Sequence, residues 1–237
     1  MISKKEIICP ENLISLAKSK GPVKAVIVNA VKLTAIESAK QAVDANLITP
    51  IFIGDKSIIE KNAKEISWDI SKFELIDEPV ENNTAPIAAK LASEGKVKII
   101  IKGHIHTDVL MKAVLKRDLN LIGKKRLSHI WHMTLEKNDK PLIITDGALN
   151  VLPKLETKMH ILKNSIDFAN RINIAKPKVS VLSATEEILE SVPSSLEANE
   201  LTKRAKEEGL NADVFGPMAF DNSISEKAAK IKGIKNI

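Results

Sequence analysis

The chain has 237 residues, of which 44% are hydrophobic and 28% are charged, a balance typical of a globular protein rather than a disordered one. Its single cysteine excludes a disulfide framework, and its apolar runs are shorter than the roughly 18 residues that span a membrane. The net charge of +6 would fit nucleic acid, but the basic residues alternate with 30 acids and only 3% of residues are aromatic. We therefore expect a cytoplasmic protein with no membrane and no nucleic-acid partner.

Short β-branched runs alternate with helical patterns along most of the chain. The predicted strands are residues 23–29, 50–54, 73–76, 97–101, 127–134, 142–145, 179–183 and 213–215. Apolar residues at helical spacing predict helices at residues 36–45, 85–92, 109–115 and 155–172. This alternation favours an α/β fold with a parallel sheet that is covered on both faces. In such sheets ligands bind at the carboxyl ends of the strands, in the loops that lead into helices.

The alternation is interrupted once, where two strands follow each other with no helix between them. Residues 127–134 and 141–145 are joined by a polar segment, which predicts a hairpin, and a basic turn precedes them. We interpret this point as a domain boundary. The prediction is a first α/β domain at residues 1–126 and a second at residues 127–237.

Several loops at strand ends carry residues suited to an anion. Lys102 and Gly103 follow a predicted strand and offer a cation and a close backbone approach, with Thr107 as an N-cap for the next helix. The other interpretation of this loop is a capped turn with an exposed lysine. Asp146 similarly fits either a site or an ordinary Asp-Gly turn, and Ser183 either a phosphate donor or a helix cap.

Near the C-terminus, Gly216 and Pro217 predict a turn between a strand and a new helix, a junction that aims backbone N–H groups into a cleft. Two histidine pairs, His104 with His106 and His129 with His132, raise the possibility of a metal. One cysteine and the lack of an HExxH motif argue against zinc. The sequence also lacks a P-loop, a dinucleotide-binding fingerprint and a GxSxG elbow.

Several blocks of the sequence, spread in order over nearly the whole chain, resemble one protein family. They are residues 102–108, 127–130, 145–153, 158–164, 177–186 and 216–225, followed by Ala228-Ala229-Lys230 and Lys232-Gly233-Ile234. Together they are similar to the phosphate acetyltransferase and phosphate butyryltransferase family.

The resemblance implies transfer of an acyl group between coenzyme A and inorganic phosphate. It also implies two α/β/α domains with a cleft between them, as in isocitrate and isopropylmalate dehydrogenases, and a homodimer. We expect coenzyme A to be a substrate, and we expect no metal and no other cofactor. The residues expected to bind substrate are Lys102, Gly103, Thr107, Asp146, Ser183, Glu186, Gly216, Pro217, Asp221 and Asn222.

The sequence departs from the family pattern at three points. Asn29-Ala30 stands where the family commonly has His-Pro or an acidic turn, and Phe215 stands where it commonly has Asp. Nothing here matches the Ser-Arg segment that resembles the family's catalytic core, so no catalytic residue is assigned. We expect a C-terminally incomplete second domain that needs this segment, supplied by a separate chain, for activity. The alternative is a non-catalytic remnant that binds coenzyme A or phosphate.

Overall fold

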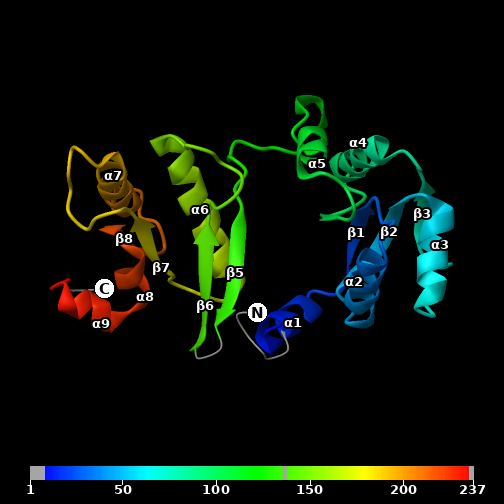
Figure 1. Ribbon diagram of the computed structural model, residues 1–237, viewed down its shortest axis with the longest axis horizontal. Helices are drawn as coiled ribbons and strands as arrows, with labels where there is room; N and C mark the ends of the chain where they lie inside the picture. The colour runs from blue at the N-terminus through cyan, green and yellow to red at the C-terminus, as the bar shows by residue number, and fades with distance from the viewer. Residues whose placement is uncertain (1–8, 136–137, 235–237) are drawn as a thin grey trace. The chain divides into compact units, whose positions relative to one another are not determined.

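The structure is a computed structural model that describes residues 9–135 and 138–234. The chain divides into two compact units, unit 1 at Met1–Lys124 and unit 2 at Lys125–Ile237 (Figure 1). Within the described residues, the helices are all too short or too polar to cross a membrane.

Unit 1 is built on a four-stranded parallel sheet. Its strands, in spatial order, are β3 (Glu74–Asp77), β2 (Ile48–Gly54), β1 (Val23–Val28) and β4 (Ile99–Lys102). The two central strands are apolar and buried along most of their length, as a parallel sheet with both faces covered requires. Val28, the last residue of β1, pairs with Ile53 of β2 and with Lys102 of β4, so the carboxyl ends of these strands lie together.

Successive residues of a strand point to opposite faces, and each face of this sheet has its own apolar cluster. The helices of unit 1 are α1 (Glu11–Lys18), α2 (Leu33–Asp44), α3 (Lys56–Glu65), α4 (Glu81–Ser93) and α5 (Thr107–Val114), with a 3-10 turn at Arg117–Leu119. Val26 and Val28 belong to the cluster covered by α4 and α5, whereas Ile27 belongs to the cluster covered by α2 and α3.

The described part of unit 2 contains two small sheets. Strands β5 (Ile130–Leu135) and β6 (Asn138–Thr145) form an antiparallel hairpin, and β7 (Lys178–Leu182) pairs in parallel with β8 (Asp213–Met218). The helices are α6 (Leu155–Arg171), α7 (Pro193–Glu207), α8 (Phe220–Ile224) and α9 (Glu226–Ile231). A third apolar cluster joins α6 and α7 to β7 and β8.

The predicted α/β fold with a parallel sheet is confirmed, and so is the hairpin. Each predicted strand and each of the four predicted helices is present, with ends shifted by a few residues. The prediction of a Gly-Pro turn is wrong, because β8 continues through Gly216 and Pro217 to Met218. Proline has no N–H to donate. β8 tolerates Pro217 because, among the described strands, it pairs on one side only, with β7, whereas a central strand pairs on both sides. Thr107 is not the N-cap of α5 but its first residue, and His106 occupies the cap position.

Candidate functional site

In unit 1, the predicted site residues lie where β4 ends and α5 begins. Lys102 is the last residue of β4 and Thr107 the first of α5, and both are exposed. The Gly103 N–H donates a hydrogen bond to the Val28 carbonyl at 2.9 Å. A Cβ on Gly103 would lie 2.5 Å from the Val28 oxygen and 2.6 Å from the Asn29 oxygen. Glycine is therefore required here to let this loop pack against the end of β1.

Asn29 fixes the same loop through His104, a role that the sequence had not suggested. It follows β1 with φ at 52°, in the left-handed region, and is 5% exposed. Its Nδ2 donates to the His104 carbonyl, and its own carbonyl accepts from the His104 N–H at 2.9 Å. Asparagine tolerates the left-handed conformation better than most residues, and this tolerance is the sequence feature that could have pointed to the role of Asn29. The departure from the family pattern at Asn29 thus has a local structural reason.

Asp146 organises a turn directly after β6. Its carboxylate accepts hydrogen bonds from the backbone N–H groups of His129 (3.0 Å), Ala148 (3.0 Å) and Leu149 (2.8 Å), and from Asn150 Nδ2 (2.6 Å). Burial would raise the pKa of Asp146, but these hydrogen bonds outweigh it and lower the pKa to about 2. The carboxylate is therefore ionised, and both of its oxygens already accept hydrogen bonds from the protein. Its structural role is to join the turn to the start of the hairpin.

The remaining predicted residues of unit 2 gather at the carboxyl ends of β7 and β8. These two strands are parallel neighbours, and the Ser183 N–H donates to the Met218 carbonyl at 2.9 Å. Ser183 Oγ lies 2.9 Å from Ser194 Oγ, near the start of α7. Gly216 and Pro217 are buried, and a Cβ on Gly216 would lie 2.8 Å from Val181 Cβ. Gly216 is therefore needed for the close packing of β8 against β7.

Two side chains at this end donate to the same carboxylate oxygen of Glu186. Asn222, which is 1% exposed, donates from Nδ2 to Glu186 Oε1, and Lys232 Nζ donates to the same oxygen at 2.8 Å. Lys232 Nζ also lies 3.5 Å from the exposed carboxylate of Asp221. The hydrogen bond from Lys232 lowers the pKa of Glu186, and the Glu186 carboxylate raises the pKa of Lys232. All four side chains can thus take part in one polar cluster.

Lys232 was not among the predicted site residues. It follows α9, ten residues beyond Asn222 and far from Glu186 in the sequence, so no spacing rule connects it to either residue. The signal that existed was the resemblance of the Lys232-Gly233-Ile234 block to the family.

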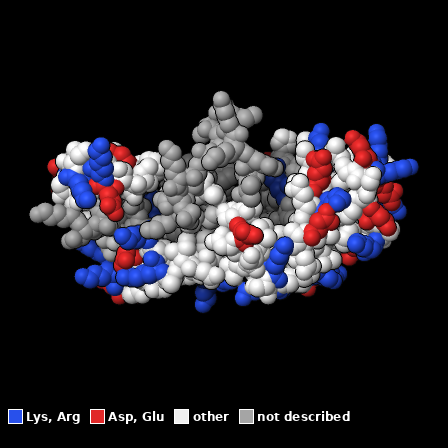
Figure 2. Space-filling view, turned by 90° about the horizontal axis from the view of Figure 1, so that it is seen from below, with Lys and Arg blue, Asp and Glu red and all other residues white. Residues whose placement is uncertain are grey.

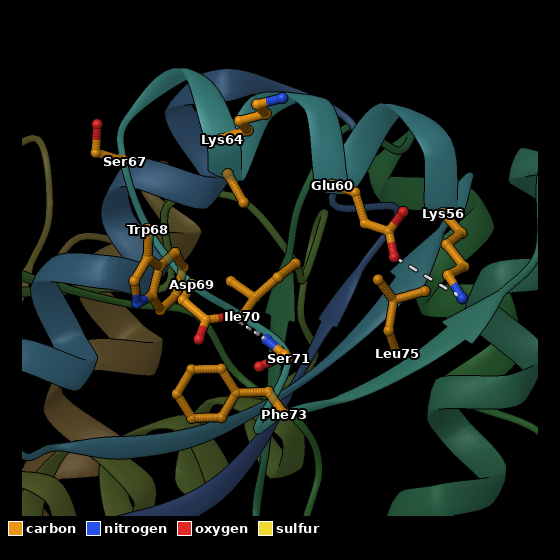
Figure 3. A pocket seen from close by; sticks show the side chains of 11 residues that line it. Lys56, Glu60, Lys64, Ser67, Trp68, Asp69, Ile70, Ser71, Phe73 and Leu75 are labelled. Atoms are coloured by element: carbon orange, nitrogen blue, oxygen red, sulfur yellow. Dashed lines mark hydrogen bonds and ion pairs between the residues drawn. The ribbon is translucent and has the colours of Figure 1, made fainter.

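A hollow of about 850 Å³ in unit 1 is lined by residues between positions 56 and 75, and it shares no lining residue with the loops described above (Figure 3). The Trp68 and Phe73 rings lie at one end of it, and Lys56 forms an ion pair with Glu60 at the other (3.8 Å). Two lysines and two acids line this hollow, so its charges balance and do not favour an anion. The loops at the strand ends of each unit remain the better candidates for anion binding.

Basic and acidic side chains are also intermixed over the surface. Figure 2 shows blue and red groups interspersed on the face that it displays. Several lysines and arginines are paired, as Lys163 is with Glu208 and Arg204 with Glu156. Across residues 9–135 and 138–234, no three His, Cys, Asp or Glu side chains come together as possible metal ligands.

Comparisons with known proteins show which family the chain is similar to. The protein family described as "Phosphate acetyl/butaryl transferase" matches residues 73–236. A phosphate acetyltransferase of Rhizobium meliloti is 35% identical over 227 residues, which cover 95% of this chain and 72% of that protein. A phosphate acetyltransferase of Rickettsia prowazekii is 38% identical over 95% of this chain and 65% of its own length. A phosphate butyryltransferase of Clostridium acetobutylicum is 34% identical over 94% of this chain and 74% of its own length. The chain thus spans about two thirds to three quarters of these relatives.

Solved structures of a phosphotransacylase and a phosphotransacetylase are also similar to this chain. A branched-chain phosphotransacylase from Enterococcus faecalis V583 is 27% identical, with a TM-score of 0.76 over 90% of this chain and 75% of that one. A phosphotransacetylase from Streptococcus pyogenes has the same TM-score at 15% identity, over 97% and 79% of the two chains, which speaks for the fold alone. The chain belongs to the phosphate acetyl/butyryl transferase family, a family of acyltransferases.

Proposed function

We propose that the protein to which this chain belongs transfers an acyl group between coenzyme A and inorganic phosphate. The observation that carries the proposal is the match to phosphate acetyl- and butyryltransferases along 94–95% of the chain. In the forward direction a phosphate oxygen attacks the thioester carbonyl, the C–S bond breaks, and coenzyme A leaves as the thiolate. The products are an acyl phosphate and coenzyme A.

The proposed roles of the residues follow from their chemistry. Lys102 is an exposed cation at the end of a strand, suited to a phosphate group of either substrate. Ser183, at the corresponding end of β7, carries a hydroxyl that can donate to an anion. Gly103 lets the loop between β4 and α5 pack against β1, and Gly216 lets β8 pack closely against β7. Asp146 holds its turn in place through its hydrogen bonds. The catalytic groups are not assigned.

Three finer proposals rest on the family resemblance. They are an isocitrate dehydrogenase-like arrangement of two domains, a homodimer, and a reaction that needs neither a metal nor a cofactor beyond coenzyme A as substrate. A fourth, a cytoplasmic location, rests on the composition and the single cysteine. Light scattering of the purified protein measures its oligomeric state. A reaction rate that does not change when EDTA is added supports the absence of a required metal, and a rate abolished by EDTA and restored by a divalent cation contradicts it.

The test of the proposed reaction measures thiol release from acetyl-CoA or butyryl-CoA with and without phosphate. We expect phosphate-dependent release of coenzyme A. Lys102→Met should raise the KM for phosphate or for coenzyme A by about 10-fold, because a charge-assisted hydrogen bond contributes about 1.5–3 kcal/mol. The matched control is Lys98→Met, an exposed lysine just before the amino end of the same strand, which should leave both constants unchanged. Coenzyme A binding without phosphate-dependent release would instead support the non-catalytic alternative.

A further inference from the structure

We propose that Lys232 is a positioning residue that clamps the loop of residues 183–192 onto α8 and α9 through Glu186. This inference rests on the proposed function, because the loop contains Ser183 and Glu186, two of the residues expected to bind substrate. Lys232 acts through Glu186 and Asp221 rather than on the reacting atoms. Lys232 therefore orders a segment of its own chain, the loop of residues 183–192.

The loop is fastened at both ends by bonds that do not involve Lys232. At its start, the Ser183 N–H donates to the Met218 carbonyl. At its end, Ser195 Oγ accepts from the Leu189 N–H at 2.9 Å and donates to the Val192 carbonyl at 2.8 Å. The middle of the loop is joined to α8 and α9 through the carboxylate of Glu186. The loss of this contact would free the middle of the loop while its ends stay attached.

Lys232 supplies the charge that makes this contact favourable. Its Nζ lies 2.8 Å from Glu186 Oε1 and 3.5 Å from Asp221 Oδ2, so one ammonium serves two carboxylates. Without it, the charges of Glu186 and Asp221 would repel each other across the cluster. The Lys232 ammonium thus contacts both carboxylates at the edge of the proposed site.

Asn222 shows why the position of Glu186 matters beyond the ion pair. Its side chain is buried, its Nδ2 donates to Glu186, and its Oδ1 meets no hydrogen-bond partner among the described residues. A buried amide with one unpaired end depends on its remaining partner for orientation. Releasing Glu186 would therefore leave Asn222, a residue expected to bind substrate, without the bond that orients it.

The first test is hydrogen exchange of a peptide covering residues 183–192, which does not require activity. Lys232→Met should make the amides of this loop exchange about 10-fold faster than in the wild type, because loss of the bond between Lys232 and Glu186 makes local opening of the loop easier. Lys232→Arg should restore protection. The matched control is Lys230→Met, an exposed lysine on α9, which should exchange as wild type. Unchanged protection of the loop in Lys232→Met would overturn the proposal.

Glu186→Gln provides a second variant that keeps an oxygen for Asn222 and Lys232 but removes the negative charge. We expect a smaller increase in loop exchange, and the double variant Glu186→Gln/Lys232→Met should exchange no faster than Lys232→Met alone. Additive effects of the two substitutions would mean that the residues act separately, and would count against the clamp.

Steady-state kinetics then tests the link to the proposed reaction. We expect Lys232→Met to raise the KM for coenzyme A by about 10-fold with kcat within about 2-fold, since it removes binding and not chemistry. A raised KM for phosphate with an unchanged loop would show that Lys232 contacts phosphate itself and would refute the positioning role. If wild type releases no coenzyme A in response to phosphate while Lys232→Met still loosens the loop, the proposed function fails and the clamp stands.

Discussion

The carboxylate of Asp146 accepts four hydrogen bonds, three of them from backbone N–H groups, and these bonds hold residues 146–150 against the start of the hairpin. We predict that Asp146→Asn lowers the free energy of unfolding by about 2 kcal/mol, because the amide replaces an acceptor with a donor that faces other donors. Urea unfolding at pH 7 measures the change. Asp167→Asn is the control, since Asp167 is exposed and forms a surface ion pair with Lys125.

The same carboxylate predicts a dependence of stability on pH. The pKa of Asp146 is about 2 in the folded protein and 3.8 without these interactions, so the unfolded state binds the proton more tightly. Its contribution to stability is complete above about pH 4 and is lost as the pH falls toward 2. We therefore expect the difference in unfolding free energy between wild type and Asp146→Asn to shrink over this range. A difference that stays constant from pH 5 to pH 2.5 would refute this assignment.

Single residues also show where the sequence was informative. The two interpretations of Asp146, site or turn, could not be separated by sequence, because only the fold brings the His129 N–H to the carboxylate. Ser183 and Asn222 were both expected to bind substrate, and the structure places Ser183 directly after β7 and Asn222 in α8 after β8, since parallel strands bring their carboxyl ends together. Lys232 was missed because its contact with Glu186 depends on how α9 packs, which no local pattern encodes.

At the scale of elements, the loop between β4 and α5 depends on close packing against β1. We predict that Gly103→Ala lowers the free energy of unfolding by about 1–3 kcal/mol, the usual cost of overpacking, since the new methyl group would meet two backbone oxygens that cannot move aside easily. The control is Gly123→Ala, also in unit 1, where an added Cβ meets nothing within 4 Å. Equal stability of the two variants in chemical denaturation would contradict the packing seen at β1.

Elements were predicted from the sequence to the extent that local pattern decides them. The apolar runs of β1 and β2 and the helical spacing of α6 mark these elements directly, because burial on both sheet faces and on one helix face dictates such patterns. The end of β8 was misjudged because Gly216 and Pro217 usually signal a turn. Here the tertiary pairing with β7 prevails over that local signal.

On the scale of the whole molecule, the two units differ in how much sheet supports them. Among the residues that the structure describes, unit 1 has a four-stranded sheet with an apolar cluster on each face, whereas unit 2 has two two-stranded sheets and one apolar cluster joining β7 and β8 to helices. A two-stranded sheet is only marginally stable by itself and depends on what packs against it. This difference favours unfolding of unit 2 before unit 1.

The two tryptophans of the chain allow the unfolding of unit 1 and the unfolding of unit 2 to be observed separately. Trp68 packs against Phe52 and Phe73 in unit 1, and Trp131 lies in the hairpin of unit 2, 54% exposed and beside the His129 ring. We predict that Trp68→Phe, which leaves the Trp131 signal, reports a urea transition at a lower midpoint than Trp131→Phe, which leaves the Trp68 signal. Circular dichroism of the wild type should then show both transitions. Coincident midpoints from the two tryptophans and from circular dichroism would mean that the units unfold together as one cooperative body, and the separate apolar clusters would not be independent units of stability.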